Sequence, residues 1–338
     1  MKPLHELTPV GRGRRLRGVA HQLLTAYGIT SPRLAQIATA SNIIFKVTDP
    51  QRSSYALRIT APKSCHGVEE IRSEVAWLHA LAEETDIGCP TPIAGLEGKY
   101  VFEIDAPGEN LKLCSALYQW VPGVTLDGVM TLENVRRHGQ LMARLHAHAA
   151  AFDPPEGFRI RSYDSVFPYA CEGFAGIEPI VLFDHGPEAP LEMAQREVFA
   201  TAHRVVADEL NALIQSSERQ RLIHNDLHIW NVKVHGDTLY ALDFEDMMWG
   251  FPLQDIATTL YYYRWQENYE SLLAAFRTGY EAHQPWPAAR PRQLETLIMG
   301  RMLLLANYVA VSKDSEDIAL APEYLTRVAA RLCDFLET

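Results

Sequence analysis

The amino-acid sequence predicts an α+β fold with two lobes, a small β-rich lobe first and a larger, mainly helical lobe after it. Strand-like segments are concentrated before residue 120, and long amphipathic segments follow. Between them lies Val121-Pro122-Gly123, whose composition is typical of a linker. The length of 338 residues also suits two units of the usual ~100–200 residues. We therefore expect an N-terminal lobe over residues 1–118, a hinge over 119–123 and a C-terminal lobe over 124–338.

The helices and strands of the small lobe are predicted from two different patterns of apolar residues. Apolar residues recur at steps of three and four where a helix is expected, and β-rich runs bounded by turn residues indicate strands. A polar turn at residues 49–52 joins the first two strand-like segments as a hairpin. In order, we expect a helix at about 14–27, strand segments at 34–47 and 54–60, a helix at about 67–84, and strands at 100–104 and 113–120.

The large lobe is predicted to be helical with one short β interlude. Val135, His138, Met142 and Leu145 form one stripe of a long helix, and a second long helix covers about 190–215. Three short strands are expected at 222–223, 232–234 and 239–242, and helices fill most of the rest.

Composition and charge exclude several classes of protein. The chain is 47% hydrophobic and 22% charged, which is ordinary for a globular protein. Its 31 Lys and Arg residues against 42 Asp and Glu residues give a net charge of −11. Long-range attraction to nucleic acid or to an anionic membrane is therefore not expected, and a small-molecule partner is favoured. The sequence leaves the oligomeric state open.

The cysteines and the apolar segments indicate a cytoplasmic protein. The five cysteines are scattered and contain no C-x-x-C pair, so neither structural zinc nor a disulfide framework is expected. Residues 1–7 lack the apolar core of a signal peptide, and the apolar stretch 302–311 is too short to cross a bilayer.

The densest polar segment, residues 224–231, predicts the chemistry. It contains Asp226 and Asn231, and Asp243 follows after the next strand-like runs, so both acids come at strand ends. In phosphoryl transfer an Asp orients the attacking hydroxyl, and an Asn and a second Asp hold the magnesium ion that neutralises the phosphates. Asp226 fits the first role, and Asn231 and Asp243 fit the metal roles.

The spacing His-x-Asp-x4-Asn over residues 224–231, followed by Asp-Phe at 243–244, resembles the catalytic and metal loops of protein-kinase-like enzymes. In particular the chain is similar to the aminoglycoside phosphotransferase and choline kinase superfamily, including its homoserine-kinase-like members. The resemblance implies a protein-kinase-like fold that uses ATP and Mg²⁺.

The resemblance extends over most of the chain. The strand that contains Arg58 resembles the one that supplies a cation to the nucleotide's α- and β-phosphates. Glu74 lies where the family's helix supplies the acidic partner of that cation. Residues 119–123 resemble the interlobe hinge, and this implies that the backbone at Gln119 and Val121 reads the adenine edge.

Two features depart from the family pattern. The phosphate cation is commonly Lys, whereas here it is Arg58, a longer and bidentate group that some relatives accept. The nucleotide loop at 38–44 contains no glycine, but its side chains are small enough for phosphates to approach, and Ser41 and Asn42 are candidate donors.

Several polar residues have structural interpretations. We expect His224 to support the catalytic loop, since Asp226 already occupies the position of the base, and Asp255 to anchor that loop through backbone hydrogen bonds. An alternative, a metal site of a hydrolase formed by His224, Asp226 and His228, has no second histidine cluster in its favour.

The acceptor site is indicated by aromatic and acidic residues. Glu245, Tyr262 and Trp265 are the candidate substrate residues, and the segment 243–281 contains seven acids and two arginines. Such a surface favours an ammonium-bearing alcohol through charge and cation–π contact. The expected function is therefore ATP-dependent phosphorylation of an amino alcohol, a hydroxy-amino acid or an aminoglycoside. The alternatives are a Ser/Thr protein kinase of the homoserine-kinase-like type and a nucleotide-binding pseudokinase.

Overall fold

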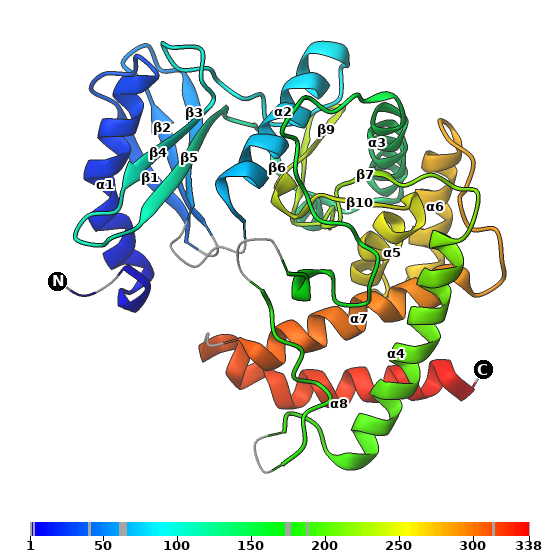
Figure 1. The fold of residues 1–338 in the computed structure, drawn as a ribbon. Coiled ribbons are helices and arrows are strands. Elements are labelled where there is room, and N and C mark those ends of the chain that lie inside the picture. Colours follow the sequence, from blue (N-terminus) through cyan, green and yellow to red (C-terminus); the bar gives the residue numbers. More distant parts are fainter. Residues whose placement is uncertain are drawn as a thin grey trace.

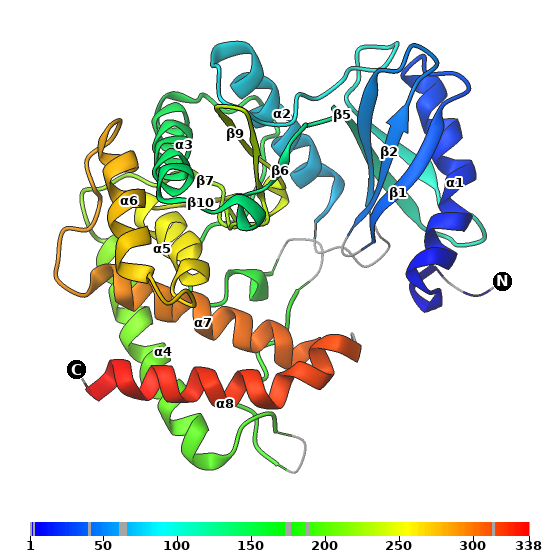
Figure 2. The ribbon, with the colours of Figure 1, turned by 180° about the vertical axis from the view of Figure 1, so that it is seen from behind.

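The computed structural model describes residues 2, 4–39, 42–60, 66–172, 177–186, 189–312 and 315–337. They form the two lobes that the sequence predicts, a sheet with a covering helix and a larger helical body (Figures 1 and 2). The first part contains α1 (Pro9–Ala26), β1 (Arg33–Thr39), β2 (Asn42–Thr48), β3 (Ser54–Thr60), α2 (Val68–Glu84), β4 (Val101–Asp105) and β5 (Lys112–Gln119). The second part contains β6 (Val124–Thr125), α3 (Leu132–Ala151), α4 (Met193–Ile214), β7 (Arg221–Ile223), β8 (Val232–His235), β9 (Thr238–Ala241), β10 (Met248–Gly250), α5 (Pro252–Tyr263), α6 (Tyr269–Glu281), α7 (Gln293–Val311) and α8 (Ser315–Glu337).

The small lobe is an antiparallel five-stranded sheet with the order β1-β2-β3-β5-β4. Helix α1 covers one face, where Leu57 and Ile59 of β3 join a core with the apolar stripe of α1. Because side chains alternate along a strand, Arg58 between them points to the opposite face, toward α2. Along β3, Leu57 and Ile59 therefore face the core of the lobe, and Arg58 faces α2 on the opposite side.

Helix α2 packs against both the sheet and the large lobe. Trp77, Leu78 and Leu81 are buried in the cluster that contains the large-lobe helices, not in the cluster beneath α1. On the same helix, Glu70 accepts a hydrogen bond from Arg161 Nη1 at 2.8 Å. The predicted boundary after residue 118 groups α2 with the sheet, and in the packing α2 shares one cluster with Ala116 and Tyr118 of β5 and with the large-lobe helices.

Helices α3 and α6 cross closely because each has a glycine at the contact. A Cβ atom on Gly279 would lie 1.7 Å from the carbonyl oxygen of Arg136, and one on Gly139 would lie 2.0 Å from that of Phe276. Neither backbone oxygen can move without separating the helices. Glycine at both positions therefore permits the α3–α6 contact.

Gly279→Ala is expected to lower the free energy of unfolding by at least about 1–3 kcal/mol, the usual cost of overpacking a core. Gly18→Ala is the matched control, because Gly18 is also helical and an added Cβ meets nothing within 4 Å. The control should raise stability by about 0.5–1 kcal/mol through its better helix propensity. Chemical denaturation measures both, and equal effects would contradict the close helix crossing.

Among the described residues one helix, α7, is long and apolar enough to cross a membrane by length and composition. It begins at Gln293, well before the apolar stretch 302–311 that the sequence suggests, so the expectation of a short segment is wrong. In the structure 67% of its most apolar window is buried, against α4, α5 and α8. This is the burial of a core helix.

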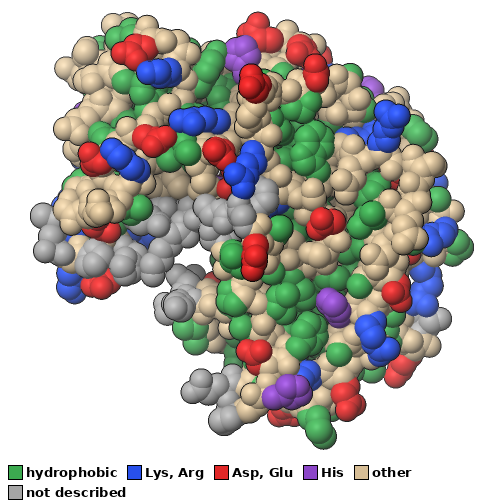
Figure 3. Space-filling model, viewed as in Figure 1, with side chains coloured by type: hydrophobic (Ala, Val, Ile, Leu, Met, Phe, Trp, Pro, Cys, Tyr) green, Lys and Arg blue, Asp and Glu red, His purple; other side chains and the backbone are tan. Residues whose placement is uncertain are grey.

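Acidic and basic side chains are interspersed on the face shown in Figure 3. Among the described residues of that face there is no continuous basic area of the kind that binds nucleic acid.

Candidate active site

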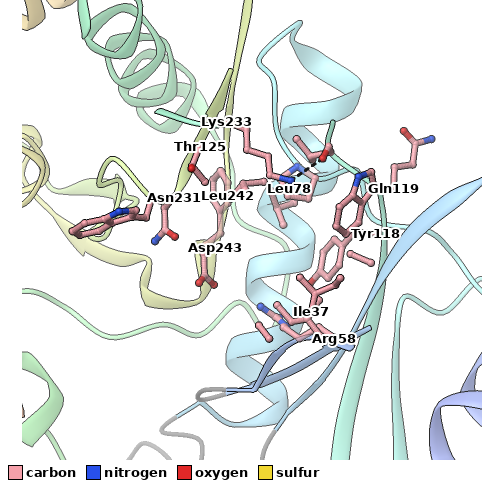
Figure 4. A pocket seen from close by; sticks show the side chains of 18 of the residues that line it. Ile37, Arg58, Leu78, Tyr118, Gln119, Thr125, Asn231, Lys233, Leu242 and Asp243 are labelled. Carbon is pink, nitrogen blue, oxygen red and sulfur yellow. Dashed lines mark hydrogen bonds between the residues drawn. The ribbon is translucent and has the colours of Figure 1, made fainter. Parts of the chain in front are cut away.

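A cleft of about 360 Å³ lies between the lobes, next to the chain segment that connects them. Arg58 and Tyr118 line it from the sheet, and Asn231, Lys233 and Asp243 line it from the large lobe. Figure 4 shows Asp243 and Asn231 on one side of this space and Arg58 on the other. The structure therefore brings residues that are about 170–185 positions apart in the sequence to a single cleft.

Arg58 and Glu74 form a bidentate ion pair. Nη1 and Nη2 of Arg58 donate to the two carboxylate oxygens of Glu74 at 2.9 and 2.5 Å, and both residues are buried. The planar guanidinium matches the carboxylate, which compensates for the lysine that the family pattern favours. Because α2 also packs against the large lobe, this pair connects the sheet to the other lobe.

The loop after β7 is held by the buried carboxylate of Asp255, in the first turn of α5. Its oxygens accept from the backbone N–H groups of His224 at 2.9 Å and Asn225 at 2.8 Å, and lie 3.0 Å from His146 Nε2. His224 in turn contacts the Leu242 carbonyl through Nε2 at 2.9 Å and accepts from the backbone N–H of Asp226 through Nδ1. These contacts fix the backbone on both sides of Asp226.

Asp255→Ala is expected to lower the free energy of unfolding by at least about 3 kcal/mol, because three buried donors each lose a partner at about 1–3 kcal/mol. Asp86→Ala is the control, since the Asp86 side chain is 90% exposed and its ion pair with Arg144 is worth little. Chemical denaturation of both variants tests the difference. A loss no greater than that of the control would show that Asp255 does not anchor the loop.

Asp226 has both carboxylate oxygens in use. Oδ1 accepts from Arg301 Nη2 at 2.5 Å, and Oδ2 accepts from Asn231 Nδ2 at 3.0 Å. His228 Nε2 lies 3.4 Å from Oδ2. His228 Nδ1 accepts the backbone N–H groups of Trp230 and Asn231, so the proton of its neutral ring is on Nε2. Asp226 is therefore oriented by donors from the loop and from α7.

Several carboxyl groups lie close together around Asp226 and Asp243. Burial raises the pKa of Asp226 to about 7, against the opposing effect of Arg301. Burial, together with neighbouring acids, also raises the pKa values of Asp243 and Glu245 to about 7. Asp246 differs: although burial acts to raise its pKa, contacts with His66 and Tyr169 hold it at about 2. These four acids outnumber the cations beside them, Arg58 and Arg301, and a bound metal ion would stabilise their charged forms.

The oxygen donors at this position suit a magnesium ion. Asn231 uses Nδ2 toward Asp226, which leaves Oδ1 as a ligand, and no described donor hydrogen-bonds the Asp243 carboxylate. Mg²⁺ prefers oxygen ligands and is usually held by one or two protein groups together with phosphates. Among the described residues no group of three His, Cys, Asp or Glu side chains suits a metal, and both ring nitrogens of His224 are engaged. The hydrolase alternative thus has no support in the structure.

Lys233 contacts the segment between the lobes, and the sequence interpretation did not include it. The backbone N–H of Gln119 donates to Thr91 at 2.9 Å, and the carbonyl of Val121 accepts from Lys233 Nζ at 3.0 Å (Figure 4). Lys233 also lies 4.7 Å from the ring centroid of Trp120. In the described part of the chain, the N–H of Val121 has no partner. The alternation of side chains along β8 could have indicated the position of Lys233, since Val232 points to the core and Lys233 to the cleft.

Of the two candidate hydrogen-bond donors to the nucleotide phosphates, the structure describes Asn42, which contacts Glu245. Ser41 lies outside the described residues. Asn42 begins β2 and donates through Nδ2 to Oε2 of Glu245, across the two lobes. Both side chains are thereby used in a contact between the lobes.

Of the aromatic candidates, the structure places Tyr262 at the site and Trp265 elsewhere. Tyr262 Oη accepts from Arg301 Nη2 at 3.1 Å, and its ring contacts that of His228. Helix α5 ends at Tyr263, so Trp265 follows it. The Trp265 ring packs against Arg327 of α8, whose guanidinium lies 4.6 Å from the ring centroid, and a role of Trp265 in substrate binding stays a prediction.

Arg301 is the main site residue absent from the sequence interpretation. It lies on α7, 75 positions from Asp226, and is 6% exposed. The signal was a single charge within the apolar run 299–311, since a buried arginine requires a partner. Sequence alone did not indicate which acid that partner is.

The chain combines a five-stranded sheet with a helical lobe, and the Arg58–Glu74 pair and Asp243 line the cleft between them. The loop that contains Asp226 is anchored beside this cleft. These features define a phosphotransferase of the protein-kinase-like class. The model of the phosphotransferase enzyme family (APH) matches residues 33–292, and the chain belongs to this family. This confirms the resemblance, the fold class and the enzyme class that the sequence predicts.

Three relatives illustrate the similarity. Amicoumacin kinase of Bacillus subtilis (strain 168) is 24% identical over 241 residues, which cover 71% of this chain and 66% of that kinase. A microcompartment-associated aminopropanol kinase has a similar structure, with a TM-score of 0.79, 23% identity, and coverage of 95% of this chain and 97% of that one. The amicoumacin kinase hAmiN, in complex with AMP-PNP, Ca²⁺ and Ami, gives a TM-score of 0.74, 18% identity and 93% coverage of both chains.

Proposed function

We propose that the chain transfers the γ-phosphate of ATP to a hydroxyl group of a small molecule. The observation that carries this proposal is the position of Asn231 and Asp243 in a cleft that is also lined by the Arg58–Glu74 pair, with Asp226 hydrogen-bonded to Asn231. Positioning and charge neutralisation supply most of the rate in phosphoryl transfer, and this arrangement provides both.

The nucleotide is proposed to occupy the cleft with its adenine at the segment between the lobes. The N–H of Val121 is available there, and the carbonyl of Gln119 is the second candidate contact. Arg58, held in place by Glu74, faces the phosphates from the sheet. Ser41 and Asn42 remain candidates to contact the phosphates when the lobes close, with Asn42 exchanging its contact to Glu245.

Asn231 and Asp243 are proposed to hold Mg²⁺. The ion supplies charge neutralisation for the phosphates when it is bound. The orientation of Asn231 is set by its hydrogen bonds to Asp226, and Asp243 is set by a left-handed backbone conformation with φ 64°. Burial and neighbouring acids raise the pKa values of Asp243 and Glu245, and a bound cation would favour their charged forms.

Asp226 is proposed as the group that aligns the acceptor hydroxyl and takes its proton. The hydroxyl oxygen forms a bond to the γ-phosphorus while the bond from that phosphorus to the β,γ-bridging oxygen breaks, which leaves ADP. The proton of the hydroxyl passes to the Asp226 carboxylate. His224 and Asp255 keep this carboxylate in position through the backbone.

A small-molecule acceptor is favoured over a protein. The named relatives are kinases of small molecules, aminopropanol and amicoumacin, and this supports an amino alcohol, hydroxy-amino acid or aminoglycoside here. The contacts among Asp226, Asn231 and their supports disfavour a pseudokinase. The five scattered cysteines, which give no disulfide framework, are the basis for proposing the cytoplasm as its location.

An acceptor screen tests the function. The purified chain is incubated with γ-labelled ATP and Mg²⁺ over a panel of amino alcohols, hydroxy-amino acids, aminoglycosides and test proteins, and small molecules are separated from protein. Label is expected in the small-molecule fraction. Label on protein would support the protein-kinase alternative, and Mg²⁺-dependent ATP binding without transfer to any acceptor would support the pseudokinase.

A further inference from the structure

We propose, building on the function proposed above, that the acceptor carries an anionic group of the carboxylate class beside the hydroxyl, and that Arg301 binds this group. The sequence favours an ammonium-bearing alcohol on the basis of acidic and aromatic residues. The structure adds a buried guanidinium in contact with the proposed base, which favours a carboxylate on the acceptor. Arg301 is thus assigned the role of a specificity-determining residue.

Arg301 is held rigidly beside Asp226. It projects from α7, a core helix that packs against α4, α5 and α8. A single nitrogen, Nη2, makes both of its contacts, to Asp226 Oδ1 at 2.5 Å and to Tyr262 Oη at 3.1 Å. The position of the guanidinium is therefore defined by the fold and does not depend on a flexible loop.

Most of the donors of Arg301 are unused. A guanidinium has five N–H donors in a planar fork. Nε of Arg301 is buried and has no hydrogen-bond partner among the described residues, and Nη1 likewise makes no contact with a described acceptor. Buried donors without partners are costly, and such groups in native structures usually have a ligand or water. A carboxylate oxygen is the strong, charge-assisted acceptor that an unused guanidinium donor favours.

The ion pair also creates a conflict that an anionic acceptor resolves. Asp226 Oδ1 is occupied by Arg301, and Oδ2 is occupied by Asn231, so an incoming hydroxyl competes for each oxygen. An acceptor with its own carboxylate gives Arg301 a second anionic partner. This weakens the hold of Arg301 on Oδ1 and leaves that oxygen available to the hydroxyl.

Aromatic side chains lie beside Arg301. The rings of His228, Trp230 and Tyr262 contact one another beside Arg301, with His228 and Tyr262 centroids 4.6 Å apart. Burial and the charge of Arg301 hold the pKa of His228 at about 3, so it is a neutral donor. The nearby acid Asp246 is already engaged by Tyr169 and His66.

Matched acceptor pairs test the proposal. Serine and ethanolamine differ only in the carboxylate, as do threonine and the corresponding aminopropanol. For the wild-type chain we expect kcat/KM to be at least about tenfold higher for the carboxylate member of a pair. Arg301→Met should lower the value for that member by about 30-fold or more, with a smaller effect on its decarboxylated partner. Arg301→Lys, which keeps the charge but not the fork, should recover part of the loss.

Arg327→Met is the matched control, because Arg327 lies against Trp265 on α8 and has no role at the site. Binding of each pair to the chain loaded with Mg²⁺ and AMP-PNP, measured by calorimetry, provides a second readout. If Arg301→Met does not fold, the wild-type ratios in turnover and binding decide the question.

The outcomes separate this inference from the proposed function. Phosphorylation of the decarboxylated members alone would overturn the carboxylate proposal and leave the kinase function intact. An equal fall for both members in Arg301→Met would show that Arg301 only supports Asp226, which also overturns it. A wild-type chain that neither phosphorylates nor preferentially binds any carboxylate member overturns it as well. Failure to bind Mg²⁺-nucleotide would overturn the proposed function itself.

Discussion

Asp226→Asn is expected to reduce kcat by about 10²–10⁴-fold, the usual contribution of a general base. Asparagine retains the size of the side chain but cannot accept the proton of the acceptor hydroxyl. The affinity for Mg²⁺-nucleotide should be nearly unchanged, since the proposed nucleotide contacts come from other residues. Steady-state kinetics with the acceptor found in the screen, together with a nucleotide titration, measures both quantities.

The control for this variant is Asp237→Asn. Asp237 lies in the turn between β8 and β9, and its side chain is 98% exposed. Because Asp226→Asn leaves the buried Arg301 without its anion, thermal denaturation must show that the variant is folded at the assay temperature. Full turnover by a folded Asp226→Asn protein would rule out Asp226 as the base.

Asp243→Asn is expected to weaken the binding of Mg²⁺-nucleotide by at least about 10–100-fold, the range found when a residue that merely supports a metal ligand is replaced. Asn is preferred to Ala because Asp243 has φ 64°, and asparagine tolerates the left-handed region. A titration of nucleotide with and without Mg²⁺ measures the effect. The loss should be confined to the experiment that contains the metal.

Asp105→Asn is the matched control for the metal site, because Asp105 lies at the end of β4 with its side chain 80% exposed. It should bind Mg²⁺-nucleotide as the wild type does. An Asp243→Asn protein with unchanged affinity in the presence of Mg²⁺ would contradict the proposed metal role.

Local patterns were sufficient to predict most elements of the fold. The stripe of α2 and the turn-bounded strands β3 and β5 are visible in the sequence because helices and strands have different hydrophobic periods. What the pattern did not contain is the partner of each apolar face. Trp77 and Leu81 pack in a cluster that includes the large-lobe helices, and only the assembled structure shows this contact.

The residues of the candidate site could likewise be predicted only in part from the sequence. Asp226, Asn231 and Asp243 were identified because they follow strands within a short stretch and match one kind of chemistry. Arg301 was missed, since its pairing joins positions 75 residues apart.

The end of α5 could not be predicted from the aromatic segment alone. The helix ends at Tyr263, so Tyr262 lies within it and Trp265 follows it. Helix boundaries are poorly defined by periodicity alone.

The most direct test of the central claim is ³¹P NMR of a reaction that contains the chain, ATP, Mg²⁺ and an acceptor from the screen. Transfer of the γ-phosphate to a hydroxyl predicts a new phosphomonoester signal that grows in equal amount with ADP and is nearly absent with Asp226→Asn. Formation of ADP with inorganic phosphate alone, or of AMP, would contradict the account.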